Sequence, residues 1–408
     1  MPPLSPAHRN LALFALALGG FGIGTTEFVS MGLLPQIAED LLPGFHENPQ
    51  AVIAQAGWVI TAYALGVVVG APVTAVVAAR LSQRKLVLIL LAAFTVASLA
   101  SATMPTFTLT ALARFVAALP HGAYFGVASL FAARLMGPGK QGAGVALALS
   151  GLTIANVVGV PLGTWLGQTA GWRWAYVAVA VIFALTLALG FLTLPRIAGN
   201  PDRGALRELT AFRNPRLWLM LAVGAVGFGG FFAVYSYIAE VTTRTAGLPG
   251  SAVPWVLATL GVGMTIGNVV GGWASDRDLT RTLLVGFGTF VLVMAAYATL
   301  GGHPVLLFVL VFAIGGTSAS LIPSVQSRII RIAGDAELLG AAMNHASFNV
   351  GNSLGAWLGG LVIAAGFGYL APGWVGVILA VAGCLLALVS VRVDRVRPVA
   401  AEPELVRR

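Results

Sequence analysis

One carboxylate, Glu27, lies inside an otherwise apolar run of membrane length that begins near Gly19. An ionisable side chain at membrane depth is costly, is seldom turned toward lipid, and usually marks an ion or substrate pathway. The alternative is that the helix ends early and leaves Glu27 at the interface. Apolar residues between Phe28 and Leu34 continue the run toward the roughly 20 residues that a spanning helix needs, which favours a buried carboxylate.

The other strongly membrane-embedded charge is Arg114. Glu27 precedes Pro35 by eight residues and Arg114 follows Thr106 by eight, so at ~1.5 Å per residue both lie about 12 Å below the outer ends of their helices. Equal depth permits pairing across the first and fourth helices. Burial favours a neutral carboxyl while a nearby cation favours a charged one, and this balance suits a group that loads and unloads protons. The alternative is a static ion pair that only stabilises the structure.

His121 follows Arg114 by seven residues, on the same face of the predicted helix and about 10 Å deeper. An imidazole at that place is a candidate proton relay. The alternative, which we favour, is a hydrogen-bonded packing residue beside Gly122. We keep His121 among the proton-coupling candidates with Glu27 and Arg114.

Polar side chains also follow one face of a predicted helix over 337–366. Asn344, Phe348 and Asn352 recur every four residues, with His345 and Asn349 on an adjacent line. Because polar amides are costly in lipid, this face either lines a cavity or contacts a neighbouring helix. Asn344, His345 and Asn349 are therefore candidate substrate-cavity residues.

Two more cavity candidates come from other segments, Asn156 and Tyr235. Tyr235 follows a glycine pair that provides a bending point, and its ring can stack on a ligand. Tyr237 is expected to be an ordinary interfacial anchor. Glu240 is expected to be solvated near the outer exit, with a place in an outer gate as the alternative.

The composition indicates that membrane-spanning segments position these residues. The 408-residue chain is 58% hydrophobic and 9% charged, with a mean hydropathy of +0.91, far from the ~25% charged residues of a soluble domain. A polytopic membrane protein follows. The net charge of +9 reflects topology and does not indicate nucleic acid, because all 23 basic residues except Arg114, Arg173 and Arg244 fall in predicted inner loops or tails, as the positive-inside rule requires.

Charges, prolines and short polar clusters divide the sequence into twelve apolar runs of spanning length. An even number places both termini on one side, which the basic loops predict to be the cytoplasm. The expected spans are 10–36, 52–79, 85–104, 107–135, 142–167, 172–195, 215–240, 251–274, 281–300, 304–327, 337–366 and 371–392.

The basic inner loop 196–214 separates six predicted helices from six more, and short patterns recur across it. We therefore expect an N-terminal half (1–195), a cytoplasmic linker (196–214), a C-terminal half (215–393) and a cytoplasmic tail (394–408), with the halves flanking a central site. The recurring sets are Gly70, Arg80 and Arg84 with Gly267, Arg277 and Arg281, and Asn156, Gly159 and Gly163 with Asn352, Gly355 and Gly359.

Several of these segments resemble the major facilitator superfamily. RFVAALPHGAYFG, which begins at Arg114, resembles that family's helix-four motif, whose Arg is implicated in proton coupling. GLTIANVVGVPLG, from Gly151 to Gly163, is similar to its antiporter motif, although Val160 separates Gly159 from Pro161. These two motifs and three further segments resemble the drug/proton antiporter branch, and most closely its arabinose-efflux-like, sugar-efflux and chloramphenicol-resistance permeases. The three segments are GTTEFVSMGLLPQIA, GWRWAY and NHASFNVGNSLGAWLGG.

The chain departs from the family in the loop between helices two and three. The family's Asp before its Arg is Ala79 here, and its Gly is Ser82. The acidic partner survives only in the second half, so a gating latch would rely on Asp276 as its main anion. A purely topological role is the alternative for the loop charges. The gating and motif residues carried over by resemblance are Arg80, Arg84, Asp276, Arg277, Gly159, Pro161 and Gly163.

The resemblance implies an all-α, twelve-helix major facilitator fold in the bacterial cytoplasmic membrane, which exports a small organic molecule in exchange for protons by alternating access. Its expected partners are a small-molecule substrate, protons and the lipid bilayer, with no nucleic acid, and a monomer is expected. No cofactor or metal is expected beyond the proton gradient, since the five histidines are scattered and no phosphate-binding loop is present. A proton-coupled importer is the first alternative, and a membrane enzyme is a distant one.

Overall fold

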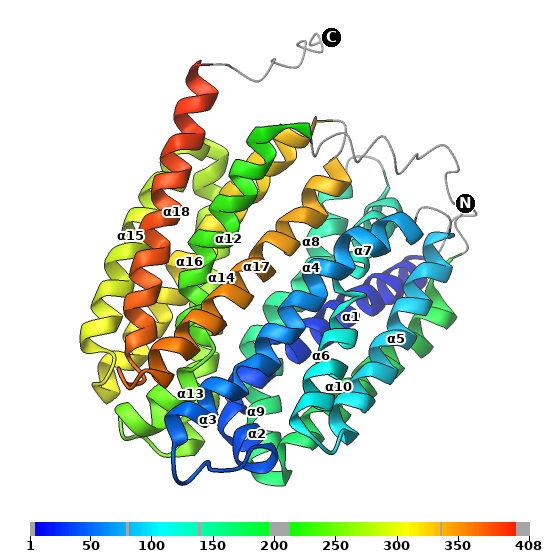
Figure 1. Cartoon of the computed structure of the whole chain (residues 1–408). Helices are drawn as coiled ribbons and strands as arrows, with labels where there is room; N and C mark the ends of the chain where they lie inside the picture. Colours follow the sequence, from blue (N-terminus) through cyan, green and yellow to red (C-terminus); the bar gives the residue numbers. More distant parts are fainter. Residues whose placement is uncertain (1–4, 79–80, 138–139, 196–212, 335–336, 397–408) are drawn as a thin grey trace.

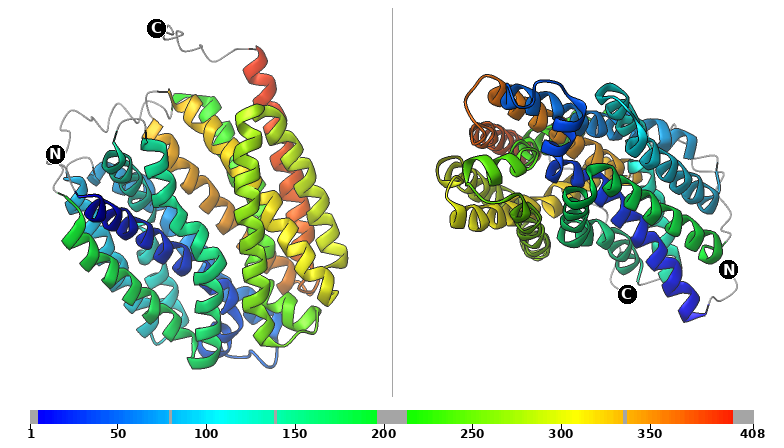
Figure 2. Two further views of the ribbon diagram at one scale, coloured as in Figure 1. Left: turned by 180° about the vertical axis from the view of Figure 1, so that it is seen from behind. Right: turned by 90° about the horizontal axis from the view of Figure 1, so that it is seen from below.

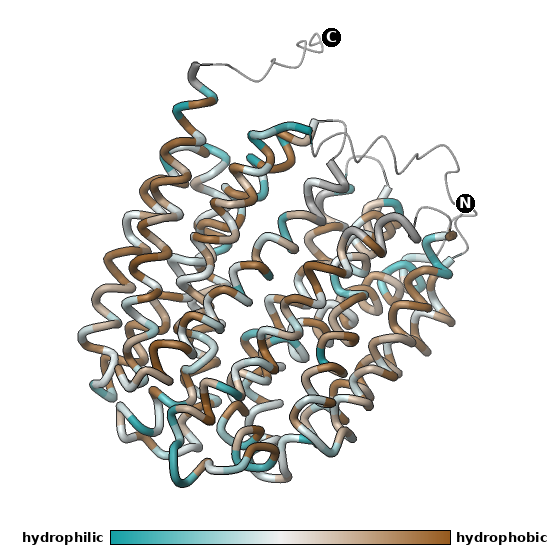
Figure 3. The backbone as a smooth tube through the Cα atoms, in the orientation of Figure 1, coloured by the Kyte–Doolittle hydropathy of each residue, from teal (hydrophilic) through white to brown (hydrophobic). Residues whose placement is uncertain are grey.

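The computed structural model describes residues 5–78, 81–137, 140–195, 213–334 and 337–396, and every regular element in these ranges is helical. The expected all-α membrane fold is confirmed. Eleven of the described helical stretches are long and apolar enough to span a membrane, and α17 is a further helix of 28 residues beside them. Hydrophobic residues run along the helices, while hydrophilic ones gather toward their ends (Figure 3).

The first group of helices precedes the linker and lies on one side of the molecule (Figures 1 and 2). Its members are α1 (Pro6–Gly32), α2 (Leu34–Leu41), α3 (Pro49–Ala56), α4 (Trp58–Ala78), α5 (Gln83–Thr103), α6 (Phe107–Ala118), α7 (His121–Met136), α8 (Gln141–Ile154), the π-helical turn η1 (Ala155–Gly159), α9 (Val160–Ala170) and α10 (Trp172–Thr193).

The second group lies on the other side (Figure 1). Its members are α12 (Pro215–Tyr235), α13 (Ile238–Glu240), η3 (Val241–Thr245), η4 (Gly250–Ala252), α14 (Val253–Arg277), α15 (Leu279–Leu300), α16 (Pro304–Ala333), α17 (Glu337–Ala364) and α18 (Ala371–Val396). The predicted span ends move by several residues: α16 continues to Ala333 instead of 327, and α1 stops at Gly32 instead of 36.

Several predicted spans are interrupted, and the interruptions have local causes. Pro120 has no N–H to continue a helix, so α6 and α7 are separate helices with His121 as the first residue of α7. Pro161 occupies the first turn of α9 directly after the π-turn, where its missing donor costs nothing. Gly57 separates α3 from α4.

Close helix packing depends on glycine at defined positions. On α14, Gly263, Gly267 and Gly271 are spaced four residues apart and face α16. A Cβ at any of them would lie 2.0–2.2 Å from a backbone oxygen of α16. Small residues let membrane helices approach closely where no water drives them together. The abundant glycines of the sequence therefore contribute directly to packing.

The two groups meet along α17, which packs on α3, α4 and α7, and along α14, which packs on η1 and α9. One apolar cluster joins them at the end of the molecule that carries α2, α3 and α13, hereafter the α2/α3 end; it includes Phe28, Ile53, Tyr235, Ile238 and Leu257. Helix α1 begins and α18 ends toward the opposite end (Figure 1).

The segment boundaries expected from the sequence stay a prediction, and 196–212 and 397–408 lie outside the described residues. Helix α18 continues to Val396, past the expected end of the span at 392. Asp394, expected in the tail, instead pairs within the described structure with Arg328, and its Oδ1 lies 3.7 Å from Nη1 of Arg216. These contacts connect α18 with α16 and α12.

Candidate transport site

Glu27 is buried near the end of α1, with 5% of its surface exposed. The helix continues past it to Gly32, so the alternative of an interfacial carboxylate does not hold in this structure. The side chain of Asn352, on α17 in the second group, interacts with the Glu27 carboxyl, and so does the Arg114 guanidinium. A single carboxylate thus contacts both groups of helices.

Arg114, on α6, is fully buried in an aromatic cage. Its Nη1 donates to Thr26 Oγ1 at 2.9 Å, one residue before Glu27. Its guanidinium carbon lies 4.2 Å from the ring centre of Tyr63 and 5.1 Å from that of Tyr176. Cations over aromatic faces are stabilised by the ring quadrupole, most strongly when water is excluded. The cage holds a positive charge at membrane depth.

The Arg114 side chain reaches from α6 to Thr26 on α1, next to Glu27, so the two residues lie at similar depth, as their spacing predicts. No ion pair within 4.0 Å joins Glu27 and Arg114 in the described part of the chain. The pair therefore interacts through space, and Nε and Nη2 of Arg114 are donors without an acceptor among the described residues.

His121 connects this cage to the second group. Its Nδ1 lies 3.3 Å from the hydroxyl of Tyr63, the residue that covers Arg114. Its ring centre lies 6.2 Å from that of His345 on α17, and the His345 ring stacks on Phe125 at 5.2 Å. The geometry fits both expected roles, a hydrogen-bonded packing residue and a relay, so the role of His121 stays a prediction.

Tyr235 and Asn156 meet between the two groups. The Tyr235 hydroxyl donates to Asn156 Oδ1 at 3.5 Å, from α12 to η1. Phe28 stacks on Tyr235 with ring centres 5.5 Å apart, beside Glu27. This arrangement gives the carboxylate an aromatic wall, as a site for a partly apolar molecule needs.

The amide side chains of α17 are buried with unused acceptors. The side-chain oxygens of Asn344, Asn349 and Asn352 have no donor among the described residues. For Asn349 the NH2 end donates to the His345 carbonyl at 3.0 Å, which leaves only the oxygen free. Buried acceptors without donors are costly and call for an explanation.

The glycine-rich segment after α8 packs on the helix that carries Glu27. A Cβ at Gly159 would lie 2.2 Å from Thr25 Oγ1, and one at Gly163 would lie 2.9 Å from Val29. Pro161 begins α9 between them, after the π-turn. Single π-turns often occur at functional sites. The segment therefore sets how closely η1 and α9 approach α1.

Among the described residues, none of the expected gating charges forms an ion pair with another. Arg80 lies outside the described residues. Arg84 donates to the Phe191 carbonyl at 2.6 Å, and Arg277 lies 3.6 Å from the ring centre of Trp273. Asp276 takes part in none of the ion pairs of the described ranges. Arg84 and Arg277 therefore contact aromatic rings and carbonyls, and the latch stays a prediction.

Two expectations about the α2/α3 end are wrong. Tyr237 is buried and donates its hydroxyl to the Ala356 carbonyl at 2.6 Å, so it is no interfacial anchor. Glu240 is also buried, with Oε2 2.5 Å from Nε of Arg244.

Burial and the nearby Glu240 raise the pKa of Tyr369, in the loop after α17, to about 12, although Arg244 opposes the shift.

Sequence reasoning missed several residues of the site. Tyr63 and Tyr176 form the cage around Arg114, and Thr26 accepts its hydrogen bond. For Tyr63 the available signal was a tyrosine in the middle of an apolar span, since a buried phenol seeks a polar partner. Asn352 had a stronger signal, because it repeats Asn156 across the two halves.

Comparisons with known proteins agree with this architecture. The sequence profile of the Major Facilitator Superfamily matches residues 16–251 and 238–406. The inner membrane transport protein YdhP of Escherichia coli is 36% identical over 383 residues, 94% of this chain and 96% of that one. The putative transporter AraJ of Escherichia coli is 33% identical over 360 residues, which cover 88% of this chain and 89% of that one. A chloramphenicol resistance protein of Streptomyces lividans is 34% identical over 385 residues, covering 92% and 95%.

Solved structures share the fold at low sequence identity. A bacterial homolog of the human lysosomal transporter Spinster, in an inward-facing and unoccupied conformation, superposes with a TM-score of 0.75 at 16% identity, covering 95% of this chain and 98% of that one. A D-xylose-proton symporter superposes with a TM-score of 0.73 at 16% identity, covering 92% and 96%.

Proposed function

Since the chain belongs to the Major Facilitator Superfamily and is a membrane transporter, we propose that it exports a small organic molecule in exchange for protons. The relatives include a chloramphenicol resistance protein, which supports an efflux role. The loop charges support an orientation in which both termini are cytoplasmic and the α2/α3 end is the outer end.

One observation carries the proposal: the Glu27 carboxyl contacts Asn352 of the second group while it interacts with Arg114 of its own group. Charging or neutralising Glu27 changes both interactions. Protonation can drive a conformational change only if the proton binds the two states with different affinity. A carboxyl that spans the boundary between the moving groups meets that condition, because its Asn352 contact depends on how the groups are packed.

The proposed cycle follows from this geometry. Substrate enters from the cytoplasm and binds among the α17 amides and the aromatic wall of Phe28 and Tyr235. The groups then rock, and the α2/α3 end opens. Protonation of Glu27 from outside weakens its attraction to Arg114, substrate leaves, and the return movement releases the proton inside. In this proposal His121 and Tyr63 carry that proton onward, which the 3.3 Å distance from His121 Nδ1 to the Tyr63 hydroxyl supports.

Transport by purified protein in proteoliposomes tests the proposal. Wild type, Glu27→Gln and Glu39→Gln are compared with a chloramphenicol-type compound, a cationic dye and a sugar, with and without an uncoupler. The Glu39 side chain is 57% exposed, so its variant is the matched control. We expect wild type and the control to move at least one compound against its gradient only while the proton gradient lasts, and Glu27→Gln to have lost this.

If the Glu27→Gln variant still moves the compound against its concentration gradient and still needs the proton gradient to do so, the assignment of the proton site is overturned. Proton and substrate moving in the same direction would identify an importer.

A further inference from the structure

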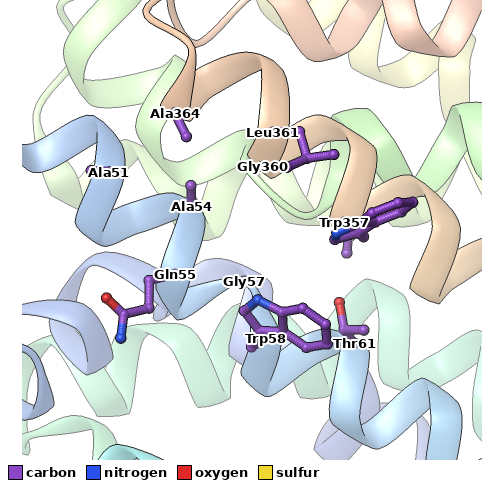
Figure 4. Close-up of a pocket in the computed structure, with 11 residues that line it drawn as sticks. Ala51, Ala54, Gln55, Gly57, Trp58, Thr61, Trp357, Gly360, Leu361 and Ala364 are labelled. Atoms are coloured by element: carbon purple, nitrogen blue, oxygen red, sulfur yellow. The ribbon is translucent and has the colours of Figure 1, made fainter.

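A separate cavity of about 200 Å³ lies where α3 and α4 meet α17 (Figure 4). Small residues form much of its lining, among them Ala54, Gly57 and Gly360, while Trp58 and Trp357 stand along it. The volume equals roughly six or seven water-sized groups. No residue of the Glu27 cluster lines it, and its α17 residues Ala356, Gly360 and Ala364 continue the line of Asn344, Phe348 and Asn352 beyond the polar side chains.

The cavity faces the hydrocarbon of the membrane. Trp58, Trp357 and Leu361 are each nearly half exposed, and α3 and α4 form one membrane span. The medium around such side chains is lipid acyl chain. A void with no atoms on one side loses dispersion contacts, so a chain that enters the cavity gains contacts that a flat helix surface does not provide.

The floor of the cavity is the boundary between the two groups of helices. A Cβ at Gly360 would lie 3.3 Å from the carbonyl oxygen of Ala54 across that boundary. The Tyr237 hydroxyl fills the space between Gly57 and Gly360, 2.4 and 2.6 Å from where their Cβ atoms would be. The cavity exists only while α4 and α17 are in contact at this end.

One exposed polar side chain lines the cavity. Gln55 is six residues into α3, which begins at Pro49, about 9 Å along the helix. That depth is close to the boundary between headgroups and hydrocarbon. Its amide can donate a hydrogen bond to an ester carbonyl there. An occupant with an acyl chain and an ester at one end matches both the apolar lining and this donor.

We propose that this cavity binds the ester-proximal segment of one acyl chain of a membrane phospholipid, with the ester beside Gln55. The bound chain fills the space between Trp58 and Trp357 and is lost when the α2/α3 end opens. A ligand that binds only one state shifts the population toward it. The lipid therefore favours the closed α2/α3 end. This site does not depend on the proposed proton coupling.

Photocrosslinking tests the site. Wild type, Ala364→Phe and Ala170→Phe are reconstituted with phosphatidylethanolamine that carries a diazirine in one acyl chain, illuminated and mapped by mass spectrometry. Ala364 is an exposed cavity residue that ends α17, so a phenyl group there occupies the space. Ala170 is an exposed residue that ends α9, away from the cavity, and is the matched control.

We expect wild type and Ala170→Phe to carry several times more adduct on residues 51–61 and 356–364 than on the exposed face of α14, and Ala364→Phe to lose that excess. Gln55→Leu, which leaves the cavity open, should reduce it. Even labelling of all lipid-facing helices, or an excess that survives in Ala364→Phe, would overturn the proposal. Equal thermal midpoints of the variants verify that each is folded.

Discussion

Removing the guanidinium of Arg114 should expose its coupling to Glu27. Arg114 is fully buried, donates one hydrogen bond to Thr26, and lies against the rings of Tyr63 and Tyr176. A hydrogen bond from a charged group contributes about 1.5–3 kcal/mol, and a desolvated cation–π contact about 2 kcal/mol. These contributions overlap, so we expect Arg114→Met to lower the free energy of unfolding by about 3–5 kcal/mol.

The double variant measures how far the effects of the Glu27 carboxyl and the Arg114 guanidinium depend on each other. Glu27→Gln alone keeps an amide beside Asn352 but removes the carboxyl that interacts with the guanidinium, and should cost about 1–3 kcal/mol. In Glu27→Gln/Arg114→Met neither charge remains, so the loss should be smaller than the sum of the single losses by about 1–3 kcal/mol.

Reversible unfolding by SDS in mixed micelles measures the cycle. Glu27→Gln combined with Arg84→Met is the control, because Arg84 contacts Phe191 and not the Glu27 site. This control pair should be additive within about 0.5 kcal/mol. Equal additivity for Glu27 and Arg114 would refute the coupling and with it the electrostatic role of Arg114 at the proton site.

Two further predictions concern packing and pH. A Cβ at Gly271 would lie 2.2 Å from the Ser320 carbonyl oxygen, whereas one at Gly272 would meet nothing within 4 Å. Gly271→Ala should therefore lower the free energy of unfolding by about 1–3 kcal/mol, while Gly272→Ala should raise it by up to about 1 kcal/mol. Thermal midpoints measure both effects, and equal effects would contradict the packing of α14 on α16. Partial burial opposes ionisation of Asp40, but hydrogen bonds from Arg173 and a neighbouring indole hold its pKa below the usual value. The stabilisation is present above pH ~4 and is lost as the pH falls through the lowered pKa of Asp40. Because the Asp40 and Arg173 side chains are both over a third exposed, Asp40→Asn should lower the free energy of unfolding by less than about 1 kcal/mol at pH 7. The difference in stability from wild type should shrink toward pH 3, and a difference that grows there would contradict the assignment.

Much of the fold could be predicted from the sequence, because a bilayer imposes a length on each apolar run and places charges at the ends. The burial of Glu27 followed from the same reasoning. The interruptions at Gly57 and Pro120 did not, since membrane helices tolerate both residues when neighbours satisfy the backbone. Whether a break occurs depends on packing, as the Tyr237 hydroxyl beside Gly57 illustrates.

Counting along a helix gives depth but not the direction in which a side chain points. Depth correctly placed Glu27 and Arg114 at one level, yet the hydrogen bond of Arg114 goes to Thr26. Depth also suggested that Glu240 is solvated, whereas Arg244, one helical turn later, and the surrounding helices bury it. Partners on other helices decide exposure near a helix end, and a single sequence does not show them.

The polar contacts of the site are unequally divided between the two groups. The first group supplies Glu27 and Arg114, the charged residues of the cluster, while the second supplies neutral amides and rings. A change in the charge of Glu27 therefore reaches the second group through Asn352 and through the nearby Tyr235, whereas His345 stacks on Phe125. If the proposed coupling operates, substitution of Asn352 should uncouple proton movement from rocking of the groups while the Arg114 cage stays intact.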